Sequence, residues 1–147
     1  MQLRGKTVKS VGWGLWISLC LMTTTVWAES AGDLLPKALK GEWMATSIDS
    51  LPVMEHSPTS FQLKDGKVTG NAACNRYFGS FELNDDQLVF DQLASTQTYC
   101  ADALMDQELR FLQTMERVAA WRIENGVLLL LDGNDEVILK LARSGAK

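Results

Sequence analysis

Apolar and polar residues alternate in short runs along most of the chain after Gly41. Such alternation is typical of strands that bury one face and expose the other. Clusters of Gly, Asn, Asp and Pro separate the runs and indicate turns, and Ser50–Pro58, with two of the three prolines, is expected to be a loop. The expected strands are Glu42–Asp49, Thr59–Lys64, Lys67–Asn71, Arg76–Leu83, Gln87–Phe90, Trp121–Glu124, Val127–Leu131 and Glu136–Ala142.

Two of the expected turns have the strongest hairpin signal. Asp65-Gly66 and Asn125-Gly126 each separate two strand-like runs by two residues. A two-residue turn between antiparallel strands needs positive φ at its centre, which Asn, Asp and Gly tolerate best. We therefore expect β-hairpins at both positions.

One segment, Asp102–Ala119, has a helical period instead. Its apolar residues recur at 3.6-residue spacing and share one face, and Asp102 is placed to act as the N-cap. The order of strands, one helix and further strands predicts an α+β fold rather than a βαβ unit. The apolar face consists of Leu104, Phe111, Leu112, Met115, Val118 and Ala119.

The N-terminus has the pattern of a secretory signal peptide. A basic start precedes an apolar run, Val11–Met22, which is shorter than the roughly 20 residues that a membrane span needs. Val26-Trp27-Ala28 then supplies suitable residues for a cleavage site. We predict that residues 1–28 are a signal peptide removed before Glu29, so that the protein is exported to the periplasm without a stable membrane span.

Two alternatives at the N-terminus place the protein on a membrane. The signal could stay uncleaved as an anchor, or Cys20 could be lipidated. Lipidation needs a small residue before the cysteine, whereas Leu19 stands there and the apolar run continues past Cys20.

Composition and charge limit the partners. The 147 residues are 46% hydrophobic and 22% charged, as in ordinary globular domains. The formal charge is −4, and removal of Arg4, Lys6 and Lys9 with the signal leaves 11 basic and 18 acidic residues, a charge of −7. An acidic protein lacks the basic surface that nucleic acids need, so nucleic acid is not expected as a partner.

Cleavage would leave two cysteines, Cys74 and Cys100. In an oxidising compartment an even pair normally forms a disulfide, and closing this loop stabilises a fold by about 3.5 kcal/mol in the chain-entropy model. The alternative is a redox pair, although redox cysteines usually stand as Cys-x-x-Cys and these lie 26 positions apart.

The segment around the first cysteine carries a family resemblance. Asn71-Ala-Ala-Cys74-Asn75-Arg-Tyr77-Phe-Gly79, followed by Thr96-x-x-x-Cys100 and Glu108-x-x-Phe111-Leu112, resembles the META domain family, which includes the bacterial heat-shock protein HslJ. The resemblance covers residues 39–143, after a leader at 29–38. Further matching features are Gly41-x-Trp43, Pro58-Thr59, Asp65-Gly66-x-Val68-x-Gly70, Leu128-x-Leu130 and Leu139-x-Leu141.

The resemblance implies a small, mostly antiparallel sheet or half-open barrel with one packed helix. It also implies an exported envelope protein linked to stress and without established enzymatic activity. One position departs from the family, which commonly has Gly before the first cysteine where this chain has Ala73. If that position requires positive φ, alanine there is unfavourable.

Glu108 is the most informative polar residue, because it interrupts the apolar face of the expected helix. A carboxylate there needs a partner, and Arg76, Arg122 and backbone N–H groups are the options. The alternative is a functional carboxylate with a raised pKa.

Asn75 is expected to bond the local backbone and to tolerate a left-handed conformation. Alternatively, Asn75, Arg76 and Tyr77 contribute to a ligand site.

Two other features could take part in metal binding, but their sequence signals are weaker. His56 stands without evident metal-binding partners, and Asp132–Glu136 only superficially resembles a calcium loop and is interpreted as a solvated turn. No cofactor, metal or catalytic residue is therefore expected.

We expect a non-enzymatic protein that binds an apolar ligand in a groove between sheet and helix, or an envelope protein. The alternatives are an interaction module without a ligand site and, less favoured, a hydrolase that uses Glu108.

Overall fold

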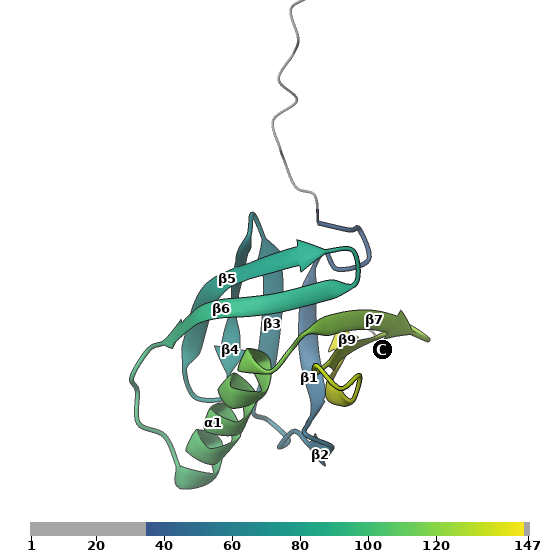
Figure 1. Ribbon diagram of the computed structural model, residues 1–147. Coiled ribbons are helices and arrows are strands. Elements are labelled where there is room, and N and C mark those ends of the chain that lie inside the picture. Colours follow the sequence, from purple (N-terminus) through teal and green to yellow (C-terminus); the bar gives the residue numbers. More distant parts are fainter. Residues whose placement is uncertain (1–34, 146–147) are drawn as a thin grey trace, which may run out of the picture. The chain divides into compact units, whose positions relative to one another are not determined.

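The computed structural model describes residues 35–145, which belong to the second of the chain's two units, Ala31–Lys147 (Figure 1). The predicted signal peptide, its cleavage site, Cys20 and the first part of the leader lie outside the described residues. None of the described helices is both long and apolar enough to cross a membrane.

Nine strands form one antiparallel sheet that closes on itself. Its order is β2-β1-β3-β4-β5-β6-β7-β8-β9, and β1 also pairs with β9. The helix α1 spans Asp102–Glu116, and the expected α+β fold with a barrel-like sheet is confirmed. The strands are β1 (Glu42–Ile48), β2 (Leu51–Pro52), β3 (Thr59–Lys64), β4 (Lys67–Ala72), β5 (Arg76–Asn84), β6 (Gln87–Ser95), β7 (Ala120–Glu124), β8 (Val127–Leu131) and β9 (Val137–Arg143).

Both predicted hairpins are present. Asp65 and Gly66 have φ values of 51° and 72°, and they join β3 to β4. Asn125 and Gly126, at 50° and 81°, join β7 to β8 in the same way. Positive φ at both central residues gives a twist that matches the twist of the flanking strands, so the local sequence sets the register of both hairpins.

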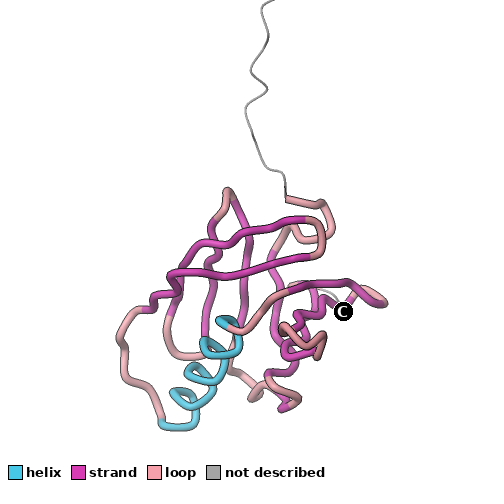
Figure 2. The backbone as a smooth tube through the Cα atoms, viewed as in Figure 1, coloured by secondary structure: helices cyan, strands magenta, loops and turns pink. Residues whose placement is uncertain are grey.

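The closure of the sheet is weakest between β6 and β7, where only Gln87 and Ala120 are paired. Two backbone bonds beside that pair, Leu88 N–H to Ala119 at 3.1 Å and Trp121 N–H to Asp86 at 2.9 Å, complete the contact. The rest of β6 runs on without a strand on that side. Helix α1 packs against β6, β4 and β1, and a long loop connects it to β6 (Figure 2).

The interior of the sheet is filled by large apolar side chains. Trp43, Phe61 and Tyr77 are at most 2% exposed and point inward from β1, β3 and β5. The ring of Phe61 meets Phe90 edge-on at 6.2 Å, and Tyr77 meets Phe111 of α1 at 5.3 Å. Such aromatic pairs supply much of the buried area in a small core, so the helix is an integral part of this core.

Element boundaries differ from the prediction where the backbone leaves regular geometry. β1 ends at Ile48 because Asp49 and Ser50 have positive φ, and this turn produces the short strand β2, which was not predicted. β6 continues to Ser95 rather than Phe90. Gln92 has a φ of 53° and the register shifts there, so a bulge interrupts the alternation and hides the second half of the strand.

The helix also differs at both ends. It ends at Glu116 instead of Ala119, and Arg117 is its C-cap. At the other end Ala101 occupies the N-cap position without a side-chain bond, so the expectation that Asp102 is the N-cap was wrong. Asp102 is the first helical residue, and its Oδ1 accepts a hydrogen bond from the Tyr99 hydroxyl at 2.9 Å.

The described end of the leader is attached to the last strand. Leu35 and Leu39 are buried, and the Trp43 indole donates to the Leu39 carbonyl at 3.1 Å. The Arg143 guanidinium lies 4.5 Å from the centre of the Trp43 ring and donates to the carbonyls of Lys40 and Ala38 at 2.7 and 2.8 Å. This Arg143 clasp ties the two ends of the described domain together.

Gly70 gives a direct test of the sheet packing. A Cβ added there would lie 2.0 Å from the Ser60 carbonyl oxygen and 2.9 Å from the Tyr77 ring. We expect Gly70→Ala to lower the free energy of unfolding by about 2–3 kcal/mol, because backbone must move to relieve the clash. Gly133→Ala is the control, since nothing lies within 4 Å of that position. Urea unfolding of both variants measures the difference, and equal, small losses would contradict this packing.

Candidate functional site

A disulfide between Cys74 and Cys100 links the β4–β5 turn to the loop that precedes α1. The two Cα atoms are 6.0 Å apart. This is the pairing expected from the sequence. It fixes the 96–101 segment against the start of β5, where the other motif residues gather.

Asn75 lies at the centre of this region and is 2% exposed. Its Oδ1 accepts hydrogen bonds from the Thr96 hydroxyl at 2.8 Å and from the Thr98 N–H at 2.7 Å. Its Nδ2 donates to the Thr98 carbonyl and to Glu108 Oε1, both at 3.0 Å. All the hydrogen-bonding capacity of the amide is used inside the domain, as burial requires.

Glu108, 6% exposed, completes the arrangement from the helix. Its Oε2 accepts the backbone N–H of Asn75 at 2.7 Å, while its Oε1 takes the amide bond already described. Of the partners considered from the sequence, the backbone N–H is the one used. Arg122 instead pairs with Glu124 and Asp135 on the far side of the sheet. Glu108 therefore holds the motif turn against α1.

The positive φ expected near this motif occurs at Ala73, which has a φ of 102°. Asn75, which was expected to tolerate a left-handed conformation, is not among the residues with positive φ. The turn closes through the Ala72 N–H, which donates to the Asn75 carbonyl at 2.8 Å. The departure from the family glycine thus falls on the strained position of the turn.

Two further polar residues of α1 were not predicted. Gln107 is fully buried and binds the loop before β3, donating to Ser57 and Thr59 at 3.1 Å and accepting the Met54 N–H at 2.8 Å. Thr114 is also fully buried. The positions of Gln107 and Thr114, four before and three after Phe111, are the signal that could have identified them.

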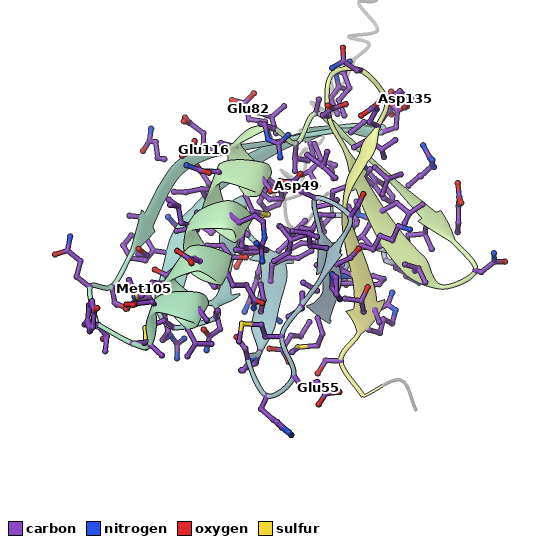
Figure 3. The ribbon with its side chains drawn as sticks, turned by 90° about the horizontal axis from the view of Figure 1, so that it is seen from below. Asp49, Glu55, Glu82, Met105, Glu116 and Asp135 are labelled. Carbon is purple, nitrogen blue, oxygen red and sulfur yellow. A yellow bond between two sulfur atoms is a disulfide. The ribbon has the colours of Figure 1, made fainter. Side chains whose placement is uncertain are left out.

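The Thr114 hydroxyl donates to Asp49 Oδ2 at 2.9 Å, and Arg117 pairs with the same carboxylate. Figure 3 looks at the helix from below, with Met105 near its start, Glu116 near its end and Asp49 beside it. Together with Gln107 and Glu108, these contacts attach α1 to three separate loops through polar side chains.

The structure separates the three residues proposed for ligand binding. Asn75 is engaged as described, and Tyr77 is 2% exposed and donates its hydroxyl to the Ser60 carbonyl at 3.1 Å. Burial raises the pKa of the Tyr77 phenol well above its usual value. Arg76 is exposed on the outer face of β5. Only Arg76 can reach a ligand without a change in the core.

Arg76 borders a depression on the outer face of β1, β3, β4 and β5, which we call the outer-face hollow. Its volume is about 330 Å³. A second depression, of about 510 Å³, lies beside the loop before β3 and shares Met44 and Pro58 with it. The lining residues of the outer-face hollow are Glu42, Met44, Pro58, Ser60, Gln62, Thr69, Gly70, Asn71 and Arg76.

Polar side chains in the outer-face hollow are unused by the fold. Asn71 Oδ1 is buried and has no hydrogen-bond partner within residues 35–145. In the same part of the chain, no ion pair or side-chain hydrogen bond of Arg76 is formed. These two side chains differ in this respect from Asn75, whose amide has all its hydrogen bonds inside the domain.

The remaining candidates have structural explanations. Asp132 Oδ1 accepts the N–H groups of Asn134 and Glu136 at 2.9 and 3.1 Å, and these bonds lower the pKa of its carboxyl. His56 has a φ of 61° in the loop before β3. Residues 35–145 contain no group of three His, Cys, Asp or Glu side chains placed to hold a metal ion.

The META domain family matches residues 37–145, nearly the whole described region. The chain belongs to the META domain family. No curated protein matches the sequence. The motif residues Asn71, Cys74, Asn75, Gly79, Thr96, Cys100 and Glu108 all lie within this META domain.

Solved structures share the fold at low sequence identity. A Burkholderia xenovorans protein studied by NMR is 21% identical, with a TM-score of 0.58 over 74% of this chain and 85% of its own. A DUF4847 family protein from Bacteroides vulgatus is 15% identical, with a TM-score of 0.55 over 75% of this chain and 96% of its own. At these identities the likeness extends to the fold alone.

Packing explains why the motif has a glycine at position 79. It lies opposite the bulge in β6, where an added Cβ would be 2.7 Å from the Leu93 side chain and 2.9 Å from the Asp91 carbonyl oxygen. A side chain at Gly79 would therefore push β5 away from β6. Most of the META motif residues thus have structural contacts, whereas Asn71 Oδ1 has no hydrogen-bond partner within residues 35–145.

Ala73→Gly should stabilise the protein by about 1 kcal/mol, because glycine adopts the φ of 102° without strain. The strain that is relieved exceeds the extra backbone entropy that glycine loses on folding. Ala94→Gly, at an exposed position of β6, should instead destabilise by about 0.5–1 kcal/mol. Thermal and urea unfolding of both variants measure this. A destabilised Ala73→Gly would show that the turn is not strained.

Asn75→Ala should lower the free energy of unfolding by about 3 kcal/mol or more. The change removes the acceptor of the Thr98 N–H and leaves one Glu108 oxygen buried without a partner. Asn134→Ala, in an exposed turn, is the control and should change stability by less than about 0.5 kcal/mol. If both substitutions have the same small effect, the Asn75 bonds do not hold this region together.

Proposed function

We propose that this META domain protein is an exported, non-catalytic binding protein of the bacterial envelope, active in the periplasm during stress. Its recognition surface is the outer-face hollow. The observation that carries the proposal is the pair of unused polar groups there, Asn71 and Arg76. A buried polar atom such as Asn71 Oδ1 is rarely left unpaired, and the exposed Arg76 beside it adds a charge that can contact a ligand.

Export is supported by the N-terminal sequence and by the disulfide. The basic start, short apolar run and Val26-Trp27-Ala28 have the pattern of a cleaved signal. The Cys74–Cys100 bond forms and persists in an oxidising compartment such as the periplasm. A role in stress is supported only by the family resemblance to HslJ.

A binding role, rather than catalysis, is supported by how the polar residues are used. Glu108, which a hydrolase of this chain would need, has both oxygens occupied by Asn75. General-base catalysis requires a group free to reach its substrate. His56 lies in a loop and is not joined by a hydrogen bond to Glu108 or Asn75 in the described region.

The packing leaves no room for a ligand between the sheet and the helix, so we place the binding site elsewhere. That space was expected to hold an apolar ligand, but Tyr77, Phe111 and Met115 fill it and are at most 2% exposed. The same observation favours a second candidate function, an interaction module that binds an envelope protein. In that case a protein segment would occupy the outer face.

Native mass spectrometry of the protein exported with its own signal tests the proposal. Cleavage before Glu29 and the loss of two hydrogens would appear in the protein mass. We expect wild-type protein to retain a small-molecule adduct or a protein partner and Arg76→Gln to lose it. Lys67→Gln, at an exposed position of β4 outside the hollow, should retain it.

Two results would contradict the proposal. An intact signal with protein remaining in the cytoplasm would remove the exported role. A bare, oxidised protein whose spectrum is the same for wild type and Arg76→Gln would remove the binding role of the outer-face hollow. A retained protein partner, rather than a small adduct, would establish the interaction module.

A further inference from the structure

We propose that the outer-face hollow binds short free peptides of two or three residues, with the peptide carboxylate at Arg76 and its ammonium group at Glu42. This inference rests on the proposed function and names the ligand class of the same site. It depends on how the strand register arranges the polar residues of the outer face.

The register places the lining residues in two rows across the sheet. In the first row Met44 lies opposite Ser60, Ser60 opposite Asn71, and Asn71 opposite Arg76. Because each pair faces its neighbour directly, these side chains project from the same face of four adjacent strands. The second row runs in parallel one pleat away, through Glu42, Gln62 and Thr69.

The two charges of the hollow stand at its opposite ends. Glu42 is on β1 and Arg76 is on β5, three strand spacings apart in the order β1-β3-β4-β5. Adjacent strands are separated by about 4.8 Å, so the two ends are about 14 Å apart across the strands, and Glu42 is also displaced by two residues along β1 from the row that contains Arg76. A ligand that satisfies both charges must therefore carry opposite charges at its own two ends.

Arg76 suits a carboxylate. Its guanidinium presents a planar fork of N–H donors that matches the two carboxylate oxygens, and such charge-assisted bonds are stronger than neutral ones. Asn71 stands directly opposite Arg76 and adds an amide beside the same point.

The middle of the hollow suits a peptide backbone. Ser60, Gln62 and Thr69 supply neutral hydroxyl and amide groups, which can accept from peptide N–H groups and donate to peptide carbonyls. The Gly70 backbone also lines the hollow, and a side chain at this position would point to the interior, towards the Tyr77 ring. These groups favour a polar, uncharged middle segment between two charged ends.

The dimensions agree with a di- or tripeptide. An extended tripeptide spans about 10 Å, and the Glu42 and Arg76 side chains can bridge the rest of the separation. The volume of about 330 Å³ is at the lower end of the range for small-ligand sites. A longer peptide would have to leave the hollow before its second charged end reached its partner.

The experiment uses three forms of one peptide and follows backbone amide signals of the folded protein by NMR titration. The probes are trialanine, trialanine amide, which lacks the carboxylate, and N-acetyl-trialanine, which lacks the ammonium group. We expect trialanine to shift signals of β3 and β4 saturably, and both modified forms to bind about tenfold more weakly, as the loss of one charge-assisted contact implies.

Substitutions on the protein should match the modifications on the peptide. Arg76→Gln should weaken trialanine about tenfold yet leave trialanine amide unchanged, and Glu42→Gln should weaken trialanine yet leave the N-acetyl form unchanged. Lys67→Gln and Glu82→Gln remove exposed charges outside the hollow and should leave all three titrations unchanged. Urea unfolding checks that every variant is folded.

Several outcomes overturn the inference. Trialanine that causes no saturable shift at millimolar concentration excludes the peptide class. If amidation, acetylation or the two substitutions leave the affinity for the peptide unchanged, the assigned orientation is excluded. If native mass spectrometry finds an adduct that depends on Arg76 while trialanine fails to bind, the binding function stands and only the peptide class is wrong. If neither is observed, both proposals fail.

Discussion

The contact between the Glu108 carboxylate and Asn75 is the interaction on which the rest of the domain depends. A buried carboxylate is tolerable only when N–H donors surround it, and the Asn75 backbone and amide provide them. In return, the carboxylate fixes the turn after β4, which positions the disulfide and the segment after β6. One pair of residues thus connects the helix, the motif turn and the loop that leads into the helix.

This arrangement explains why the recognition surface that we propose lies outside the barrel. Asn75, Tyr77 and Glu108 are committed to the interior, where an unpaired group would destabilise the fold. Asn71 and Arg76 belong to the same motif but project from the opposite face of the sheet. Within the short sequence from Asn71 to Tyr77, Asn75 and Tyr77 therefore pack in the interior, while the side chains of Asn71 and Arg76 lie on the outer face.

Much of the architecture could be predicted because local signals agreed with the fold. The two hairpins followed from Asp65-Gly66 and Asn125-Gly126, and the disulfide followed from a single remaining pair of cysteines. What failed depended on distant contacts. The buried roles of Gln107 and Thr114 required loops that only the tertiary structure brings to the helix, and the bulge at Gln92 concealed half of β6. The outer-face hollow was also missed, because it arises from register across four strands.

The Arg143 clasp sets the order in which the domain can be completed. Arg143 and β9 come last in the described domain, while their partners, β1 and the carbonyls of Ala38 and Lys40, come first. A polypeptide that is synthesised or threaded through a pore from its N-terminus cannot close this ring until β9 emerges. Until then β1 lacks one of its neighbouring strands, so the barrel closes only after its last strand has emerged.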